Sequence, residues 1–118
     1  MLENVSVGTD IEEIKRFEGK ETNFAFLSKV FTTQELEYCL KSKQPAKHLC
    51  ARFCAKEAIV KALTGLDVKG VYYSDIEILN RNDGLPQANI KKYPDIKIRI
   101  SLSHCKDYAT ANVIAERI

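Results

Sequence analysis

The stretch ARFCAKEAIVKAL, residues 51–63, indicates a helix that is surrounded by protein on most of its sides. Eleven of the fifteen residues from 49 to 63 are apolar, and the other four carry charges. Pro45 predicts where this helix begins, and Gly65 predicts where it ends. Because a helix that is apolar all round lies in a core, we expect one long central helix whose charges are at least half buried.

The four charges of this helix form two neighbouring pairs. Each residue turns a helix by about 100°, so Arg52 lies beside Lys56, and Glu57 lies beside Lys61. A buried charge without a partner destabilises a fold. In one interpretation Glu57 and Lys61 neutralise each other while Arg52 and Lys56 extend to the surface. In the other, the partners come from a phosphorylated ligand that carries a magnesium ion: the metal is the cation for Glu57, and the phosphate is the anion for Lys61.

A second carboxylate that could hold such a cation is Asp10, at the end of a short strand predicted over residues 4–9. Gly8 on the same face would leave room for a ligand beside it. Asp10 also has a purely structural interpretation. With Glu13 it forms a capping box that would begin a helix over DIEEIKRFE, residues 10–18.

His104 ends the predicted strand KIRISLSH, residues 97–104, and we assign it to the polar face that also carries Ser101 and Ser103. A lone histidine is often a structural residue. In a phosphate site it could instead donate a hydrogen bond to an oxygen or transfer a proton near neutral pH.

The remaining patterns place helices in the first half of the chain and strands in the second. Thr32 and Glu35 form a capping box for one of these helices. The sequence RNDG predicts a turn between two strands. The additional predicted elements are short helices at 24–31 and 33–42, and strands at 72–79 and 109–116. These elements predict a single α+β domain over residues 1–118, with a largely antiparallel sheet packed with the long central helix.

Composition limits the kinds of partner that we expect. The hydrophobic fraction of 45% and the charged fraction of 29% are typical of a globular protein. A net charge of +2 is too weak to indicate a nucleic-acid partner. No apolar run suggests a signal peptide or a membrane partner. Four cysteines without a CxxC pair indicate free thiols, so we expect a cytoplasmic protein.

Together these segments resemble the holo-acyl-carrier-protein synthases, the short branch of the 4′-phosphopantetheinyl transferases. Three segments carry the resemblance, and a fourth, SDIEILNRNDGLP at residues 74–86, is similar but less specific. The three are GTDIEEIKR at 8–16, ARFCAKEAIVKAL at 51–63 and ISLSHCKDYATANVI at 100–114.

The resemblance implies an enzyme of fatty acid biosynthesis that transfers phosphopantetheine from coenzyme A to a serine of apo acyl carrier protein. It also implies Mg²⁺ dependence, with Asp10 and Glu57 as the metal ligands, and adenosine 3′,5′-bisphosphate as the second product. By the resemblance, Glu57, Lys61 and His104 are the catalytic residues. The residues that it assigns to coenzyme A binding are Arg52, Lys56, Lys61, His104, Gly84 and Pro86.

The same resemblance implies two protein contacts. Lys15 and Arg16, on the predicted helix opposite Ile14 and Phe17, would bind the acidic carrier protein. The short enzymes of this family are trimers with active sites between subunits, so a homotrimer is expected. Two alternatives remain: a non-catalytic module that binds coenzyme A, and a structural domain without a ligand.

Overall fold

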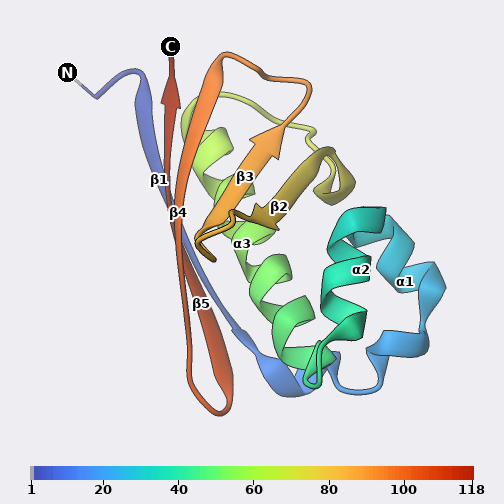
Figure 1. Ribbon diagram of the computed structural model, residues 1–118. Coiled ribbons are helices and arrows are strands. Elements are labelled where there is room, and N and C mark those ends of the chain that lie inside the picture. Colours follow the sequence, from blue (N-terminus) through green and yellow to red (C-terminus); the bar gives the residue numbers. More distant parts are fainter. Residues whose placement is uncertain (1) are drawn as a thin grey trace.

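A long helix, α3, packs across one face of a three-stranded antiparallel sheet in the computed structural model, which describes residues 2–118 (Figure 1). The strands lie in the order β1-β5-β4, so the last strand of the chain is the middle strand of the sheet. A second sheet consists of the antiparallel pair β2-β3. Helices α1 and α2 lie on the opposite side of α3 from the three-stranded sheet (Figure 1). The predicted α+β class, antiparallel sheet and long helix are confirmed.

The elements follow the predicted order closely. The strands are β1 (Val5–Glu13), β2 (Ile76–Asn80), β3 (Pro86–Ile90), β4 (Ile96–His104) and β5 (Tyr108–Arg117). The α-helices are α1 (Phe24–Val30), α2 (Thr33–Lys41) and α3 (Pro45–Gly65). Three single turns of 3-10 helix are η1 (Ile14–Phe17), η2 (Lys20–Thr22) and η3 (Tyr73–Asp75).

Small residues allow α3 to approach the sheet closely. On β5, Ala109, Ala111 and Ala115 are fully buried beneath the helix. On β1, a Cβ atom added to Gly8 would lie 1.9 Å from the carbonyl oxygen of Ala58. Gly8 is therefore required for contact with α3, and the expectation that it leaves room for a ligand is wrong.

The first strand is longer than the sequence pattern predicts. A helix was expected over residues 10–18, but β1 continues through Glu13 and pairs with β5 along its whole length, with Asp10 opposite Ala111. Only the single turn Ile14–Phe17 follows it. Asp10 lies inside this strand, so its expected role as a helix cap is wrong.

Glu35 joins α2 to β2 through a buried carboxylate. The predicted capping box is present, because Thr32 N donates to Glu35 Oε1 at 2.8 Å and Glu35 N donates to Thr32 Oγ1 at 3.3 Å. The second carboxylate oxygen accepts a hydrogen bond from Ile78 N at 2.8 Å. Glu35 is fully buried, so it needs these partners and a counter-ion.

Among residues 2–118, no helix combines the length and the apolar character needed to cross a bilayer.

Candidate functional site

Asp10 and Lys61 meet where β1 passes the C-terminal half of α3. Lys61 Nζ lies 3.2 Å from Asp10 Oδ1 and donates to the carbonyl oxygen of Thr9 at 2.9 Å. The Asp10 side chain is 10% exposed, and its Oδ2 atom is buried without a hydrogen-bond partner in the described chain. A buried carboxylate oxygen without a donor is costly, so Asp10 is placed to accept a cation.

Glu57 belongs to the same site. It lies one helical turn before Lys61 on α3, and its Oε1 atom accepts a hydrogen bond from the hydroxyl of Tyr73. Burial, the hydrogen bond to Glu57 and the charges of Glu57, Asp10 and Glu12 together raise the pKa of Tyr73 to about 12, with burial the largest cause. The Tyr73 hydroxyl therefore stays protonated and lies among three acidic side chains.

Glu12 is a further member of this group, and the sequence pattern did not indicate it. In a strand, residues two positions apart share a face, so Glu12 lies beside Asp10 and turns toward α3. Burial, followed by the adjacent Asp10, raises the pKa of Glu12 to about 7, and Arg16 opposes the shift. Val7 and Ile11 point to the other face of the sheet. This alternation of faces, which persists through residue 11, was a signal in the sequence that β1 continues past its predicted end.

The donor set fits a magnesium ion. Within residues 2–118, no group of three or more His, Cys, Asp and Glu side chains is arranged to hold a metal by itself. Mg²⁺ is usually held by one or two carboxylates, with water and ligand phosphates completing its shell. Asp10 and Glu57 match that requirement, and the unpartnered oxygen of Asp10 supports it.

The charged residues of α3 do not neutralise one another. Glu57 accepts from Tyr73, and Lys61 pairs with Asp10, so both have partners in other elements. The interpretation in which Glu57 and Lys61 form an internal ion pair is therefore wrong. Lys61 keeps 54% of its side chain exposed, which leaves its ammonium group accessible to an anionic ligand.

Lys56 is not available to a ligand, so its assignment to coenzyme A binding is wrong. The side chain is fully buried, and burial lowers its pKa although Glu35 opposes the shift. Its ammonium group already has four acceptors within 2.8 Å, which use all of its protons. These acceptors are Val30 O, Glu35 Oε1, Tyr73 O and Ile76 O.

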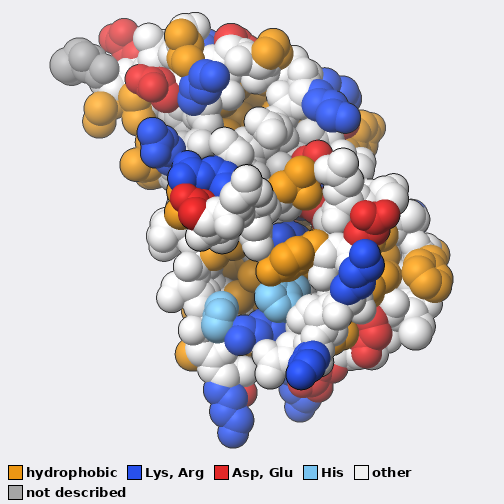
Figure 2. All heavy atoms as spheres, in the orientation of Figure 1, with side chains coloured by type: hydrophobic (Ala, Val, Ile, Leu, Met, Phe, Trp, Pro, Cys, Tyr) orange, Lys and Arg blue, Asp and Glu red, His pale blue; other side chains and the backbone are white. Residues whose placement is uncertain are grey.

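Arg52, on α3, and His104, at the end of β4, belong to other elements than Asp10 on β1. Arg52 is 3% exposed, its guanidinium carbon lies 4.3 Å from the ring centroid of Tyr38, and its Nε atom has no partner among the described residues. Burial lowers the pKa of His48, and the charges of Arg52, Lys47 and His104 add to that shift. Figure 2 shows the histidines on one face with Lys and Arg side chains beside them.

The register of the sheet separates His104 from the strand that carries Asp10. His104 lies opposite Ala109, and Ala109 lies opposite Glu12 on β1. Two strand spacings place His104 and Glu12 about 10 Å apart. His104 lies two positions after Leu102 in β4, so the two residues share one face of the sheet, and Leu102 packs against the core. It therefore faces α3, and its assignment to the face of Ser101 was wrong.

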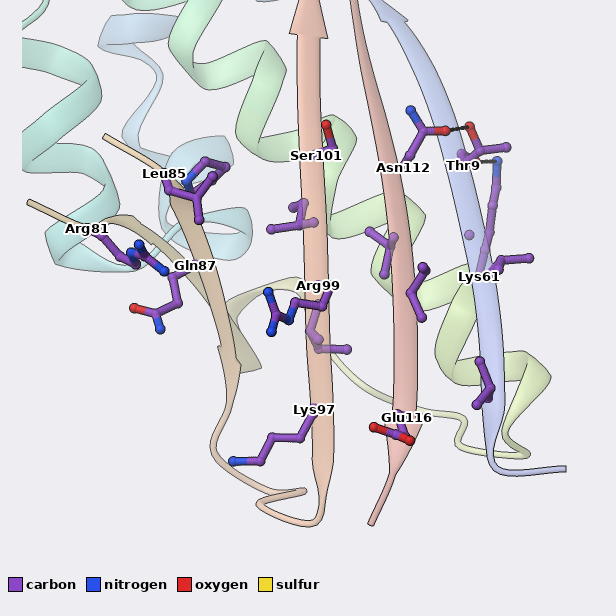
Figure 3. Close-up of a pocket in the computed structure, with 18 residues that line it drawn as sticks. Thr9, Lys61, Arg81, Leu85, Gln87, Lys97, Arg99, Ser101, Asn112 and Glu116 are labelled. Atoms are coloured by element: carbon purple, nitrogen blue, oxygen red, sulfur yellow. Dashed lines mark hydrogen bonds between the residues drawn. The ribbon is translucent and has the colours of Figure 1, made fainter. Parts of the chain in front are cut away.

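Gly84 and Pro86 lie at the turn between β2 and β3. The predicted turn is present: Gly84 has a φ of 86°, and its N–H donates to the carbonyl oxygen of Arg81 at 2.9 Å. Pro86 lines an open groove of about 1410 Å³ that follows the outer face of the sheet (Figure 3). Arg81 and Arg99 line one part of this groove and Lys61 another, with β5 between them (Figure 3).

The outer face of the sheet carries exposed apolar side chains among its polar ones. Val7 is 72% exposed and lies directly opposite Ile114, which is 52% exposed. Ile11, further along β1, is 60% exposed. Exposed apolar rows of this kind are typical of surfaces that another protein covers.

Lys15 and Arg16 are exposed on η1, opposite the buried Ile14 and Phe17, as the sequence predicts. Arg16 forms an ion pair with Glu12 while keeping 60% of its side chain exposed. The exposed basic pair therefore adjoins the acidic group at the end of β1.

Comparison with known proteins places the chain in a family. The model of the 4′-phosphopantetheinyl transferase superfamily matches residues 6–113. The holo-[acyl-carrier-protein] synthase of Protochlamydia amoebophila is 45% identical over 115 residues, which cover 91% of this chain and 93% of that protein. The enzyme of the same name from Thermodesulfovibrio yellowstonii is 41% identical, covering 92% and 95% respectively.

Solved structures agree with these sequence relatives. The holo-(acyl-carrier-protein) synthase of Bacillus anthracis in complex with CoA (3′,5′-ADP) has a TM-score of 0.81 and 29% identity, and covers 96% of both chains. The Helicobacter pylori synthase in complex with coenzyme A has a TM-score of 0.78 and 28% identity, covering 93% of this chain and 99% of that one. The chain therefore belongs to the 4′-phosphopantetheinyl transferase superfamily, among the holo-[acyl-carrier-protein] synthases.

Proposed function

We propose that this chain transfers 4′-phosphopantetheine from coenzyme A to a serine of apo acyl carrier protein in fatty acid biosynthesis. The products are holo carrier protein and adenosine 3′,5′-bisphosphate. The observation that carries this proposal is the nine-tenths buried carboxylate of Asp10, which meets Lys61 and has one oxygen free for a cation. Membership of the holo-[acyl-carrier-protein] synthases supplies the reaction that such a site performs.

Asp10 and Glu57 would hold one Mg²⁺, which supplies charge neutralisation on the pyrophosphate of coenzyme A. Lys61, with about half of its side chain exposed, binds a phosphate oxygen and stabilises the negative charge of the departing phosphate. The ion pair with Asp10 holds the Lys61 side chain at the site before coenzyme A arrives. Tyr73 holds Glu57 by its hydrogen bond.

The second half of the coenzyme A site belongs to a neighbouring copy in this proposal. Within one chain His104 lies two strands away from Asp10, so a single chain presents two incomplete halves. The apolar row Val7 and Ile114 on the outer face supports an association that buries this surface. A homotrimer would bring the Arg52 and His104 of one copy to the Asp10 of the next.

Gly84 and Pro86 contribute to the nucleotide end of the site in this proposal. A glycine with positive φ lets the turn approach a ligand closely, and Arg52 has a buried Nε atom free to donate to a phosphate oxygen. Lys15 and Arg16 would bind the acidic carrier protein beside Glu12.

We place this chemistry in the cytoplasm. All four cysteines are free, and Cys39, Cys50 and Cys54 are buried in the core. Burial raises the pKa of Cys39 to about 11 and that of Cys50 to about 12, so these thiols are unreactive. Free thiols are typical of proteins in a reducing compartment.

Intact mass of apo acyl carrier protein tests the proposal directly. The carrier is incubated with this protein and coenzyme A, with Mg²⁺ or with EDTA. A phosphopantetheine increment that needs the metal is the expected result. If coenzyme A raises the melting temperature but no carrier gains mass, the chain is instead a non-catalytic module that binds coenzyme A.

A further inference from the structure

We propose that Tyr73 is a positioning residue that holds the Glu57 carboxylate in the conformation that the cation site requires. The inference rests on the proposed function, in which Asp10 and Glu57 share a magnesium ion. It goes beyond that function by assigning a role to a residue outside the helix and the strand that carry the two carboxylates.

The contact between the two side chains leaves room for a metal. The Tyr73 hydroxyl donates to Glu57 Oε1, so Oε2 stays available for a cation. A glutamate side chain has several rotatable bonds, and ordering it costs conformational entropy. A hydrogen bond made before the ligand binds removes part of that cost from the binding step.

The ring of Tyr73 is fixed by aromatic packing. Its centroid lies 5.5 Å from that of Phe53, with an angle of 57° between the ring planes. Phe53 in turn lies 5.4 Å from Phe17. Phe53 and Glu57 are four residues apart on α3, so they share one helix face. The ring and the hydroxyl of Tyr73 therefore contact the same face of α3, one turn apart.

The backbone of Tyr73 is fixed by the buried lysine. Lys56 Nζ donates to the carbonyl oxygen of Tyr73 at 2.8 Å and to Glu35 Oε1 at 2.7 Å. Lys56 immediately precedes Glu57 in α3. The buried ion pair thus acts on Glu57 through Tyr73, although Lys56 itself cannot reach a ligand.

A phenol suits this role because it is neutral. A lysine or arginine in the same place would bind Glu57 more strongly but would cancel the charge that attracts the cation. A phenylalanine would fill the same space and leave the carboxylate without its donor. Tyr73 orients Glu57 and leaves its negative charge intact.

The test compares Tyr73→Phe with Tyr72→Phe. The first variant keeps the packed ring and loses only the hydroxyl. The second removes the same group from a neighbouring residue that is 70% exposed. Calorimetry measures Mn²⁺ binding to each protein in the presence of coenzyme A and without carrier protein. Transfer assays measure the Mg²⁺ concentration for half-maximal rate and the KM for carrier protein.

We expect Tyr73→Phe to weaken Mn²⁺ binding and to raise the Mg²⁺ requirement, each by about ten- to a hundredfold, as the loss of one hydrogen bond to a charged group predicts. The KM for carrier protein and the melting temperature should stay close to those of the wild type. Tyr72→Phe should change none of these values.

Two results would overturn the inference, and they are distinguishable. If the wild type binds Mn²⁺ and Tyr73→Phe binds it equally well, Tyr73 has no positioning role and the proposed function stands. If the wild type itself neither binds Mn²⁺ nor needs Mg²⁺ for transfer, the proposed metal site is wrong, and the role of Tyr73 is wrong with it.

Discussion

The ammonium group of Lys61 lies 3.2 Å from the carboxylate of Asp10, although the two residues are 51 positions apart in the chain. The contact joins the residue that is predicted to bind the metal, Asp10, to the residue that is predicted to bind a phosphate, Lys61. The two side chains are therefore paired before any ligand arrives, and a ligand must either replace this ion pair or bind beside it.

Removing the charge of Glu57 or Asp10 should stop transfer without unfolding the protein. We expect Glu57→Gln and Asp10→Asn to lower kcat by about a hundredfold or more, since a Mg²⁺ contact stabilises the transition state by several kcal/mol. The rate of carrier mass increase measures this effect. Glu13→Gln, at an exposed position of the same strand, is the control. Near wild-type rates for the first two variants would contradict the metal assignment.

Removing the buried charge of Lys56 should destabilise the fold. We expect Lys56→Met to lower the free energy of unfolding by about 3–5 kcal/mol, because it leaves Glu35 buried without a counter-ion. Urea unfolding measures this change. Lys61→Met, at a half-exposed position, should lower stability far less while impairing coenzyme A binding. Equal stability losses would mean that burial does not distinguish these two lysines.

Arg16 should affect the binding of carrier protein but not the binding of coenzyme A. We expect Arg16→Gln to raise the KM for carrier protein by about tenfold and to leave the KM for coenzyme A unchanged. The effect should shrink as salt concentration rises, because exposed charges are screened. Lys91→Gln, an exposed lysine outside η1, provides the control. Parallel changes in both KM values would remove the docking role.

Glu12 should make the metal-free protein less stable as pH rises. Its pKa is raised to about 7 in the folded state, so between about pH 4.5 and 7 the folded chain binds a proton that the unfolded chain has lost. The contribution of Glu12 to the free energy of unfolding therefore falls across this range and is constant above it. Glu12→Gln should remove this fall, as urea titrations in EDTA at pH 5 and pH 8 would reveal. The same pH dependence in both proteins would contradict the prediction.

A charge on the outer face of the sheet should prevent association. We expect Ile114→Asp to yield a folded monomer with little transfer activity, because the charge would be buried between copies. Light scattering measures the mass of the particle, and circular dichroism reports the fold. Glu116→Gln, on the same face of β5, should leave the assembly intact. A trimer of unchanged mass for Ile114→Asp would contradict the proposed interface.

Local signals predicted much of the fold. The bounds of α3 followed from Pro45 and Gly65, and the capping box of α2 from Thr32 and Glu35. These signals act between residues a few positions apart. The end of β1 was mispredicted because Asp10 has good helix-capping chemistry, and its pairing with Ala111 depends on the far end of the chain.

The partners of the charged residues in α3 were also beyond the reach of local sequence signals. The pattern predicts buried charges, but it cannot tell which of them has an internal partner. Glu35 lies 21 residues before Lys56, and Tyr73 lies 16 residues after Glu57. Neither spacing leaves a periodic signal, so the structural role of Lys56 and the contact to Glu57 required the fold.

The central position of β5 has a consequence for synthesis of the chain. Val5 pairs with Glu116, so among the described residues β1 pairs within the three-stranded sheet with a strand that is made more than 90 residues later. Such distant pairing is slow to form and leaves strand edges exposed in the meantime. A nascent chain can build α1, α2 and α3 early, but Asp10 cannot reach its final position until β5 has been made. A chain that still lacks β5 therefore carries no competent cation site.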